Sequence, residues 1–480
     1  MGRRIPMWQV LLVIAFMVAS LMYTIIAIDG YMHTALVFSG AFAALIAIAN
    51  GYKWSYLEKG ILRNIDSSMQ ALLILLTVGM LIGTWLAGGV IQAMIYYGLM
   101  ILKPAIFLPA VCVICSIVSL ATGSAWTTAG TVGIAFIGIG GALQIPEAMT
   151  AGAIVSGAYF GDKMSPLSDS TNLAAAMGGA NLFDHVKHMV WTVTPSWLIA
   201  IVIYGIIGSR FGAGDASLES VTELMTVLKD NFYISPLLLI PPLCVILLIV
   251  FKVPAMPGLY GGALLGLVFA MIFQGGNFGE ILGITMYDGF VSETGNAFVD
   301  ELLTRGGLAS MFYSAVLVLC AMVVAGVLDV ADMLNIVCEK ILKVAKSTGS
   351  LVAVTLVSCI ACNILCADQY VAIVLPGRMY KEEFENRHLM NRNLSRILED
   401  GGTVTSALVP WTTCGAYMST TLGVATVAYL PFAFMNLINP FVSLFYGITG
   451  ISMKKMSDEE YEAMLKKREL DKKMAAGEIE

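Results

Sequence analysis

Long apolar runs alternate with short polar segments along the chain, and most runs approach the ~20 residues that a helix needs to cross a bilayer. The runs form two series of similar order. The first comprises 8–28, 33–50, 68–87, 104–146, 147–180 and 189–207, and the second comprises 233–251, 254–273, 308–328, 350–377, 398–422 and 425–451. This pattern predicts an all-α polytopic membrane protein, because the strands of a membrane barrel would alternate in ~10-residue units.

Two landmarks recur at nearly the same offset, which indicates an internal duplication. The segment SMQALLILLTVGMLIGTWL, which starts at Ser68, resembles SMFYSAVLVLCAMVVAGVL, which starts at Ser310. A proline-containing stretch around Pro166 likewise resembles one around Pro410. Each series of runs is therefore expected to be one repeat of about five spans.

The chain accordingly divides into two repeats, a linker and a tail. We expect the first repeat in residues 1–210, a polar and acidic linker in 211–232, and the second repeat in 233–451. Residues 452–480 are rich in charge and are expected to form a cytosolic helix. The start of this tail has a serine followed three residues later by a glutamate, which is the pattern of a capping box.

Corresponding loops of the two repeats carry opposite charge, which indicates that the repeats are inverted. Basic loops are expected on the cytoplasmic side, together with both termini, and acidic loops on the other side. The basic residues are Arg3, Arg4, Lys53, Lys59, Arg63, Arg378, Lys381, Arg387, Arg392 and Arg396, and the acidic residues, in 276–304, are Glu280, Asp288, Glu293, Asp300 and Glu301.

Each repeat contains a glycine-interrupted block and a proline-interrupted run. Residues 104–146 and 350–377 are expected to fold back as re-entrant hairpins, whereas 147–180 and 398–422 are expected to be broken helices. Pro166 removes one helical hydrogen bond and disfavours helix at the preceding residue. Because irregular backbone inside a bilayer must line a cavity or be buried in protein, these four segments are candidates for an ion site.

The first break combines a carboxylate with hydroxyl and amide oxygens, which are the ligands that small hard cations prefer. Asp169 is the expected anionic ligand, and Ser124 in the hairpin tip ATGSAWTTAG is expected to face it. The candidate binding residues of this half are Asp162, Ser165, Ser168, Asp169, Thr171, Asn172, Ser124, Thr127 and Thr128, of which Asp169, Ser168, Asn172 and Ser124 are the expected Na⁺ ligands.

The second half offers fewer charges at the corresponding places. Its candidates are Asn363 and Asp368 at the hairpin tip and Thr412 and Thr413 at the break, where no acid aligns with Asp169. The coupling ion is therefore expected in the first half.

Asp162 and Lys163 are adjacent ionisable residues within an apolar run. As a functional pair, Asp162 binds and releases a proton while Lys163 competes for the acid. Alternatively, both lie at an interfacial loop end, with Lys163 extending to the headgroups. His185 and His188 are expected at a solvated cytosolic helix end.

Composition narrows the classes of function. Of the 480 residues, 58% are hydrophobic and 12% are charged, so a soluble protein could not cover its surface with polar groups. The formal net charge of −6 provides no electrostatic footprint for nucleic acid. The glycine-rich runs lack the Gly-Lys-Ser/Thr signature of a phosphate-binding loop, and no catalytic Ser/His or paired-Asp arrangement is apparent. We expect no enzymatic activity and no cofactor besides the transported ions.

The stretch GAYFGDKMSPLSDSTNLAAA, from Gly157 to Ala176, closely resembles the GDKMSPLSDTTNLA motif of the NhaC family of Na⁺/H⁺ antiporters. Ser170 stands where that family frequently has threonine. The resemblance implies transport coupled to Na⁺ and H⁺, inverted repeats with re-entrant hairpins, and a multi-pass location in a bacterial or archaeal cytoplasmic membrane. The motif residues that it identifies here are Asp162, Ser165, Ser168, Asp169, Thr171 and Asn172.

We therefore expect an antiporter that exchanges Na⁺ for H⁺. The alternative is a Na⁺- or H⁺-coupled carrier of a small carboxylate or amino acid, because the family is also similar to exchangers of malate for lactate. The absence of an arginine in the middle of a predicted span favours cation exchange. The expected partners are the lipid bilayer, Na⁺ and H⁺, with a small carboxylate or amino acid and a second copy of the chain as further candidates.

Overall fold

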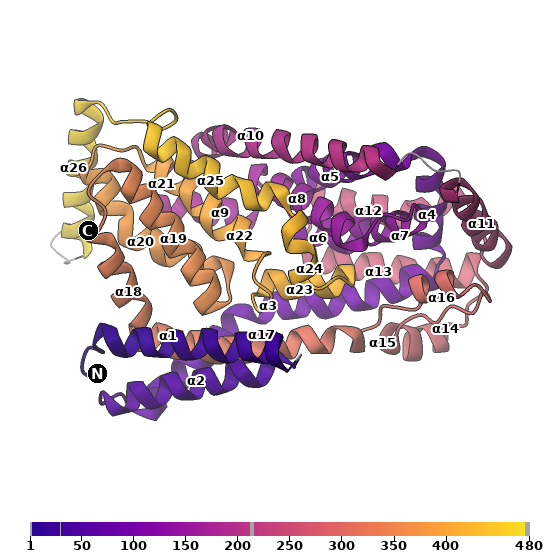
Figure 1. The fold of residues 1–480 in the computed structure, drawn as a ribbon, viewed down its shortest axis with the longest axis horizontal. Helices are drawn as coiled ribbons and strands as arrows, with labels where there is room; N and C mark the ends of the chain where they lie inside the picture. Colours follow the sequence, from indigo (N-terminus) through magenta and orange to yellow (C-terminus); the bar gives the residue numbers. More distant parts are fainter. Residues whose placement is uncertain (1, 29, 212–215, 476–480) are drawn as a thin grey trace.

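The computed structural model describes residues 2–28, 30–211 and 216–475, and its regular elements there are helices (Figure 1). Nine of the described helices are long and apolar enough to cross a membrane, or up to eleven if each of two sharply bent pairs counts as one span. Most run along the long axis of the molecule, and both termini lie at the same end (Figure 1). The chain is an all-α polytopic membrane protein, as the apolar pattern predicts.

Among the described residues of the first half there are ten α-helices. They are α1 (Met7–Met22), α2 (Met32–Ala49), α3 (Trp54–Ala87), α4 (Val90–Ile101), α5 (Pro104–Thr122), α6 (Ala125–Thr128), α7 (Ile134–Ala142), α8 (Glu147–Met164), α9 (Asp169–Gly178) and α10 (Leu182–Gly208). A π-helical segment, Ala129–Gly133, joins α6 to α7, so the three form one continuous arm of the first hairpin.

The second half begins with α11 (Ala216–Asn231), α12 (Ile240–Val250) and α13 (Ala255–Phe273), followed by the short α14 (Phe278–Glu280), α15 (Met286–Asp288) and α16 (Ala297–Leu303). The remaining helices are α17 (Phe312–Val330), α18 (Met333–Leu342), α19 (Thr348–Cys366), α20 (Gln369–Asn386), α21 (Asn391–Leu398), α22 (Val404–Ser406), α23 (Thr413–Leu422), α24 (Thr426–Tyr429), α25 (Phe434–Thr449) and α26 (Asp458–Ala475). A π-helical segment, Glu399–Thr403, joins α21 to α22.

Three polar segments that the sequence suggests to be loops or linkers are largely helical. α3 starts at Trp54, so Lys59 and Arg63 lie on this helix and not in a loop. The acidic segment 211–232 contains α11, and the basic segment after the second hairpin consists mostly of the end of α20 and the start of α21. The reason is that none of these segments contains a proline that would break the helix, and polar side chains fit a helix whose surface is partly in water.

The tail helix α26 starts as its capping pattern predicts. The Ser457 amide donates to Glu460 Oε2 (2.8 Å), and the Glu460 amide donates to Ser457 Oγ (3.2 Å). This reciprocal pair satisfies two amides that a helix start leaves open.

The two halves repeat the same order of elements at one offset. α5, α8 and α9 begin at residues 104, 147 and 169, whereas α19, α21 and α23 begin at residues 348, 391 and 413, a difference of 244 in each case (348 − 104 = 244). Gly179 and Gly423, which end α9 and α23 in the left-handed conformation, are related by the same offset. The element bounds therefore support a duplication, and the inverted orientation of the repeats stays a prediction.

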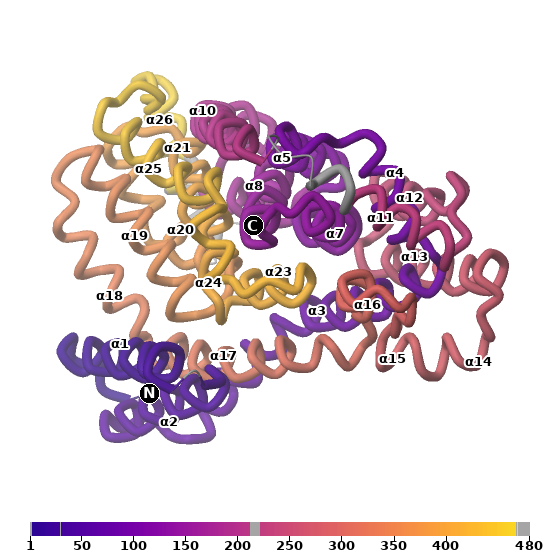
Figure 2. Tube along the Cα trace, turned by 45° about the vertical axis from the view of Figure 1, so that its right-hand side comes forward, coloured from indigo at the N-terminus to yellow at the C-terminus, as the bar shows by residue number. Residues whose placement is uncertain are grey.

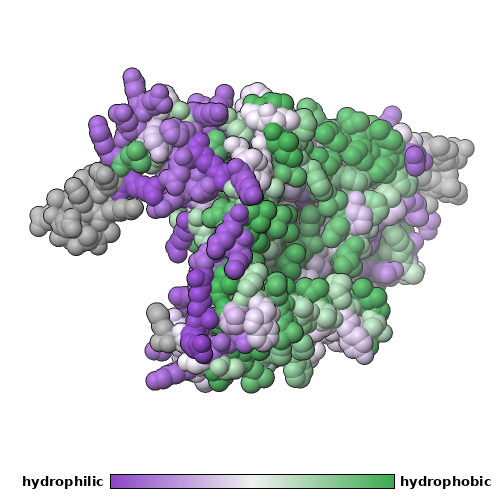
Figure 3. All heavy atoms as spheres, turned by 60° about the vertical axis from the view of Figure 1, so that its left-hand side comes forward, coloured by the Kyte–Doolittle hydropathy of each residue, from purple (hydrophilic) through white to green (hydrophobic). Residues whose placement is uncertain are grey.

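Helices from distant parts of the sequence lie side by side. α17 packs against α2 and α3, and α25 packs against α10 and α19. Figure 2 shows α1, α2 and α17 on one side of the molecule, with α19, α20 and α25 on another. In Figure 3 hydrophilic residues gather at one end of the face and, in smaller number, at the opposite end, and a broad hydrophobic surface lies between them, as expected for a protein in contact with lipid.

Glycines of α8 let this helix pack closely against α5. A Cβ added at Gly157 would lie 2.3 Å from the Cys112 carbonyl oxygen, and one added at Gly161 would lie 2.4 Å from the Leu120 amide nitrogen. Small residues that allow such close approach are common between membrane helices, because lipid provides no hydrophobic drive for helices to associate. The first hairpin is thus held against the helix that ends at the first break.

Replacing Gly157 with alanine is expected to lower the free energy of unfolding by about 1–3 kcal/mol, because the added methyl group forces α5 and α8 apart. Thermal unfolding of the purified variant in detergent measures the change. Gly205→Ala in α10 is the matched control, since its Cβ would meet nothing within 4 Å. Alanine there is expected to stabilise the helix by about 0.5–1 kcal/mol, and equal midpoints for the two variants would contradict the close packing.

Candidate functional site

A cavity of about 830 Å³ lies where the two hairpin tips meet the first helix break. The tips contribute the residues that follow α5 and α19, and the break contributes the segment between α8 and α9. The wall also includes the first residue of α23, part of α3, Tyr159 and Asp162 of α8, and residues between Ile249 and Ala255 where α12 meets α13. The four irregular segments that the sequence singles out therefore lie at or beside one cavity.

The first hairpin tip is a tight turn that packs on the first break. α5 ends at Thr122 and is followed by Gly123, whose φ is +69°. Ser124 caps α6 by accepting a hydrogen bond from the Thr127 amide (3.1 Å). A Cβ added at Gly123 would lie 2.8 Å from Leu167 Cβ, so glycine satisfies both the conformation and the space at this position.

The first break is an unwound segment between two well-defined helix ends. α8 ends at Met164, and Ser168 is the N-cap of α9. Thr171 Oγ1 donates to the Lys163 carbonyl (3.1 Å), and Asn172 Nδ2 donates to the Pro166 carbonyl (2.9 Å). These bonds satisfy carbonyl groups that the interrupted helix leaves without partners.

The second tip and break have similar geometry. α19 ends at Cys366 and is followed by Ala367 in the left-handed conformation. Asp368 caps α20 by accepting a hydrogen bond from the Tyr370 amide (2.8 Å). The Thr413 amide donates to the Ala367 carbonyl (2.9 Å), so this tip is bonded directly to the start of α23. Thr412 is the N-cap of α23.

The structure places eight of the candidate residues in the cavity wall. They are Ser124, Thr127, Asp162, Ser168, Asp169 and Asn172 from the first half, and Asp368 and Thr413 from the second. The candidates that lie outside the lining are Ser165, Thr171, Thr128, Asn363, Thr412 and Lys163. Thr171, Thr128 and Thr412 instead donate hydrogen bonds to backbone carbonyls.

Asp162 and Asp169 reach the cavity from either side of the break. Asp162 is 7% exposed, and its carboxyl faces Ser168 and Asp169. Asp169 itself is exposed on the cavity wall. Two carboxylates with hydroxyl oxygens between them make a suitable environment for a small monovalent cation.

Helix N-termini also surround the cavity. The lining includes residues from the starts of α6, α9, α20 and α23. The backbone amides at a helix start favour negative charge. The cavity therefore combines carboxylates that attract a cation with helix ends that favour an anion.

Lys163 does not face Asp162 as the paired interpretation suggests. Its ammonium group forms an ion pair with Asp400, and both side chains are fully buried. Asp400 Oδ1 also accepts hydrogen bonds from Thr192 Oγ1 (2.9 Å) and Asn439 Nδ2 (2.7 Å). The pair thus joins α8 of the first half to the π-helical segment of the second, together with α10 and α25.

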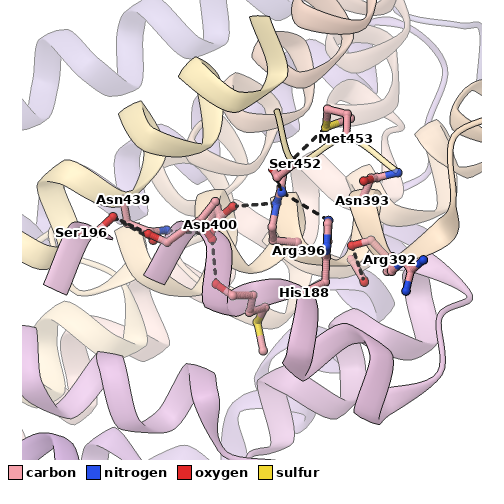
Figure 4. Close-up of polar contacts among 12 residues, drawn as sticks. His188, Ser196, Arg392, Asn393, Arg396, Asp400, Asn439, Ser452 and Met453 are labelled. Carbon is pink, nitrogen blue, oxygen red and sulfur yellow. Dashed lines mark hydrogen bonds and ion pairs between the residues drawn. The ribbon is translucent and has the colours of Figure 1, made fainter. Parts of the chain in front are cut away.

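Arg396 is not part of a solvated basic loop. It lies in α21 with its side chain fully buried, and its Nε is 3.6 Å from Asp400 Oδ2. Figure 4 shows Arg396 between Asp400 on one side and His188 and Ser452 on the other. The assignment of Arg396 to a loop is therefore wrong, because the helix α21 continues through the segment that the charge pattern assigned to a loop.

The two histidines are buried instead of solvated. His188 Nε2 lies 3.3 Å from an Arg396 nitrogen, and His185 Nδ1 lies 2.8 Å from Ser395 Oγ. They pack here because α10 runs beside α21.

Sequence reasoning missed Arg396, Glu399 and Asp400 as candidates. The signal that could have found them is the stretch LSRILEDGG, which places three ionisable residues next to two glycines at the start of an apolar run. Ionisable residues inside membrane helices are rare and usually functional.

Comparison with known proteins agrees with the motif. The model of the Na⁺/H⁺ antiporter family matches residues 157–451. The chain is 38% identical over 448 residues to the malate-2H⁺/Na⁺-lactate antiporter of Bacillus subtilis (strain 168). This alignment covers 93% of this chain and 96% of that protein. The chain is 36% identical over 445 residues to the Na⁺/H⁺ antiporter NhaC of Alkalihalophilus pseudofirmus, with the same coverage.

A third relative has another cargo in its name. The chain is 35% identical over 455 residues to the arginine/ornithine antiporter ArcD of Halobacterium salinarum. This alignment covers 94% of each chain. Because the family model matches more than half of the chain and these relatives cover nearly all of it, the protein belongs to the Na⁺/H⁺ antiporter family.

Proposed function

We propose that this protein is a secondary active transporter that exchanges Na⁺ for H⁺ across a prokaryotic cytoplasmic membrane. The observation that carries the proposal is the cavity at the first break, where Asp162 and Asp169 lie among hydroxyl oxygens. Membership of the antiporter family supports the same function. The protein carries out no covalent chemistry in this scheme.

In the proposed cycle, Na⁺ binds between the carboxylates of the first break and the hydroxyl groups of Ser168 and Ser124. Protonation of acids in or near the cavity weakens this binding, so the two ions compete and cannot be carried together. The bundle that carries the hairpins moves against the outer helices to expose the cavity on alternate sides, as in other transporters with broken helices.

A flux assay on proteoliposomes tests the proposal. An outward or inward Na⁺ gradient is expected to drive proton movement in the opposite direction, as measured with an entrapped pH-sensitive dye. Asp169→Ala is expected to lose most of this exchange, because it removes one of two carboxylates that attract the cation. Full Na⁺-driven exchange in Asp169→Ala would exclude the proposed site.

The second candidate is an exchanger of a small carboxylate, and two observations favour it. A cavity of about 830 Å³ is far larger than a single Na⁺ requires, and four helix starts around it favour negative charge. Labelled malate, lactate or an amino acid added to the same proteoliposomes separates the two functions. Uptake of the labelled compound, driven by a Na⁺ or H⁺ gradient, would support the second function.

A further inference from the structure

Glu399 occupies an unusual position beside the proposed ion site. It begins the π-helical segment between α21 and α22, and its side chain is fully buried. Neither carboxyl oxygen has a hydrogen-bond partner within the described part of the chain. Glu399 does not line the cavity, and so it is separate from the carboxylates of the first break.

An ionised carboxylate without partners is very unfavourable in a buried site, because the charge loses its hydration without compensation. A protonated carboxyl group has no net charge and loses only ordinary hydrogen bonds, at about 1–3 kcal/mol. The surroundings of Glu399 therefore suit its neutral form. Insertions of π-helix inside α-helices are also frequent at functional sites.

The groups that face Glu399 come from several elements. Lys163 and Asp162 face it from α8, Ser170 faces it from α9, and Cys359 faces it from α19. Thr403 and Asp400 belong to its own π-helical segment. Lys163, the cation that faces Glu399, has Asp400 as its ion-pair partner.

Ser170 connects Glu399 to the cavity. Its hydroxyl lies 3.1 Å from Ser168 Oγ, and Ser170 is itself part of the cavity wall. A hydroxyl group can accept a proton on one side while it donates its own on the other. The Ser170 hydroxyl group therefore lies between Glu399 and the cavity.

We propose that Glu399 is the residue that carries the transported proton, an inference that rests on the proposed exchange of Na⁺ for H⁺. In the step that releases the proton, the Glu399 carboxyl group turns toward Ser170 until the two are within hydrogen-bond distance. The Glu399 O–H bond then breaks and Ser170 Oγ accepts the proton. Ser170 passes its own hydroxyl proton to water in the cavity, which leaves Glu399 as a carboxylate beside Lys163.

This step couples the two ions. Loss of the proton adds one negative charge behind Asp162, which favours Na⁺ in the cavity, and rebinding of the proton removes that attraction. The buried ion pair of Lys163 with Asp400 keeps the second half in contact with the first while the charge of Glu399 changes.

The experiment compares two transport modes of the full chain in proteoliposomes. The first is proton movement driven by a Na⁺ gradient, and the second is exchange of labelled ²²Na⁺ for Na⁺ without a pH gradient. Glu399→Gln is expected to slow the first mode by about 100-fold or more, while the second continues near the wild-type rate. Glu385→Gln is the matched control, because Glu385 is 5% exposed but is paired with Arg468, and both of its modes should match the wild type.

The outcomes distinguish the inference from the proposed function. If Glu399→Gln kept full Na⁺-driven proton movement, Glu399 would not be the proton carrier. If the variant lost both proton movement and Na⁺/Na⁺ exchange, Glu399 would be needed for Na⁺ movement itself, and the inference would also be overturned. A wild-type protein that moves labelled Na⁺ but no protons would instead exclude the proposed function.

Two further measurements keep the inference testable if Glu399→Gln does not fold. Infrared spectroscopy of the wild type is expected to show the C=O band of a buried protonated carboxyl group, which should be unchanged in Glu385→Gln. Ser170→Ala retains Glu399 and is expected to slow the coupled mode selectively. The absence of the band, or an unchanged coupled rate in Ser170→Ala, would contradict the proposal.

Discussion

Replacing Asp400 with asparagine is expected to lower the free energy of unfolding by about 3–5 kcal/mol, because removing one partner of a buried ion pair leaves an uncompensated charge. Here the change leaves both Lys163 and Arg396 without their anion in a fully buried site. Unfolding of the purified variant in mixed detergent micelles measures the loss. Asp329→Asn is the control, since its ion pair with Arg63 is exposed and is worth at most about 1 kcal/mol.

A double-mutant cycle tests whether the loss comes from the pair itself. Lys163→Met in the Asp400→Asn background removes one of the two unpaired cations, so the double variant should lose less stability than the sum of the single variants. Strictly additive losses would show that Lys163 and Asp400 do not interact, and would contradict the pairing of α8 with the second half.

Asp162→Asn is expected to weaken Na⁺ binding by about 10- to 100-fold, because it removes a charge-assisted contact of about 1.5–3 kcal/mol. Asp162 is only 7% exposed, so water cannot easily replace the lost carboxylate. Asp169→Asn should have a smaller effect, since Asp169 is exposed on the cavity wall. The Na⁺ dependence of the unfolding temperature measures both affinities.

The control for this comparison is Asp184→Asn. Asp184 is an exposed acid at the start of α10 and does not line the cavity. Its replacement should leave the Na⁺ dependence unchanged. If Asp169→Asn weakened binding more than Asp162→Asn, the ion would lie nearer the mouth of the cavity than the geometry around Asp162 indicates.

Much of the helical pattern could be predicted because its causes are local. Apolar runs of sufficient length predict the spans, Pro166 predicts the end of α8, and Gly123 predicts the turn between α5 and α6. The same local rules predict the capping of α26. They do not predict whether a polar segment such as the start of α3 is helix or loop, because that depends on the helices that pack against it.

Candidate residues could be named from the sequence, but their separate uses could not. The motif places Asp162 and Asp169 close together in the chain, and both reach the cavity. Thr171 and Thr128 have the same chemistry as the lining hydroxyls, yet they bond to backbone carbonyls. Which oxygen faces a cavity depends on helix rotation, and that is a property of packing.

The sequence by itself determined the membrane class, the two series of spans, the break at Pro166 and the family motif, because each depends on residues that are neighbours in the chain. Only the tertiary structure decided that Lys163 pairs with Asp400, which is 237 positions away, and that Arg396 and Glu399 are buried. The physical reason is that the charge a buried group meets depends on which helices pack around it, and those helices come from both halves of the chain.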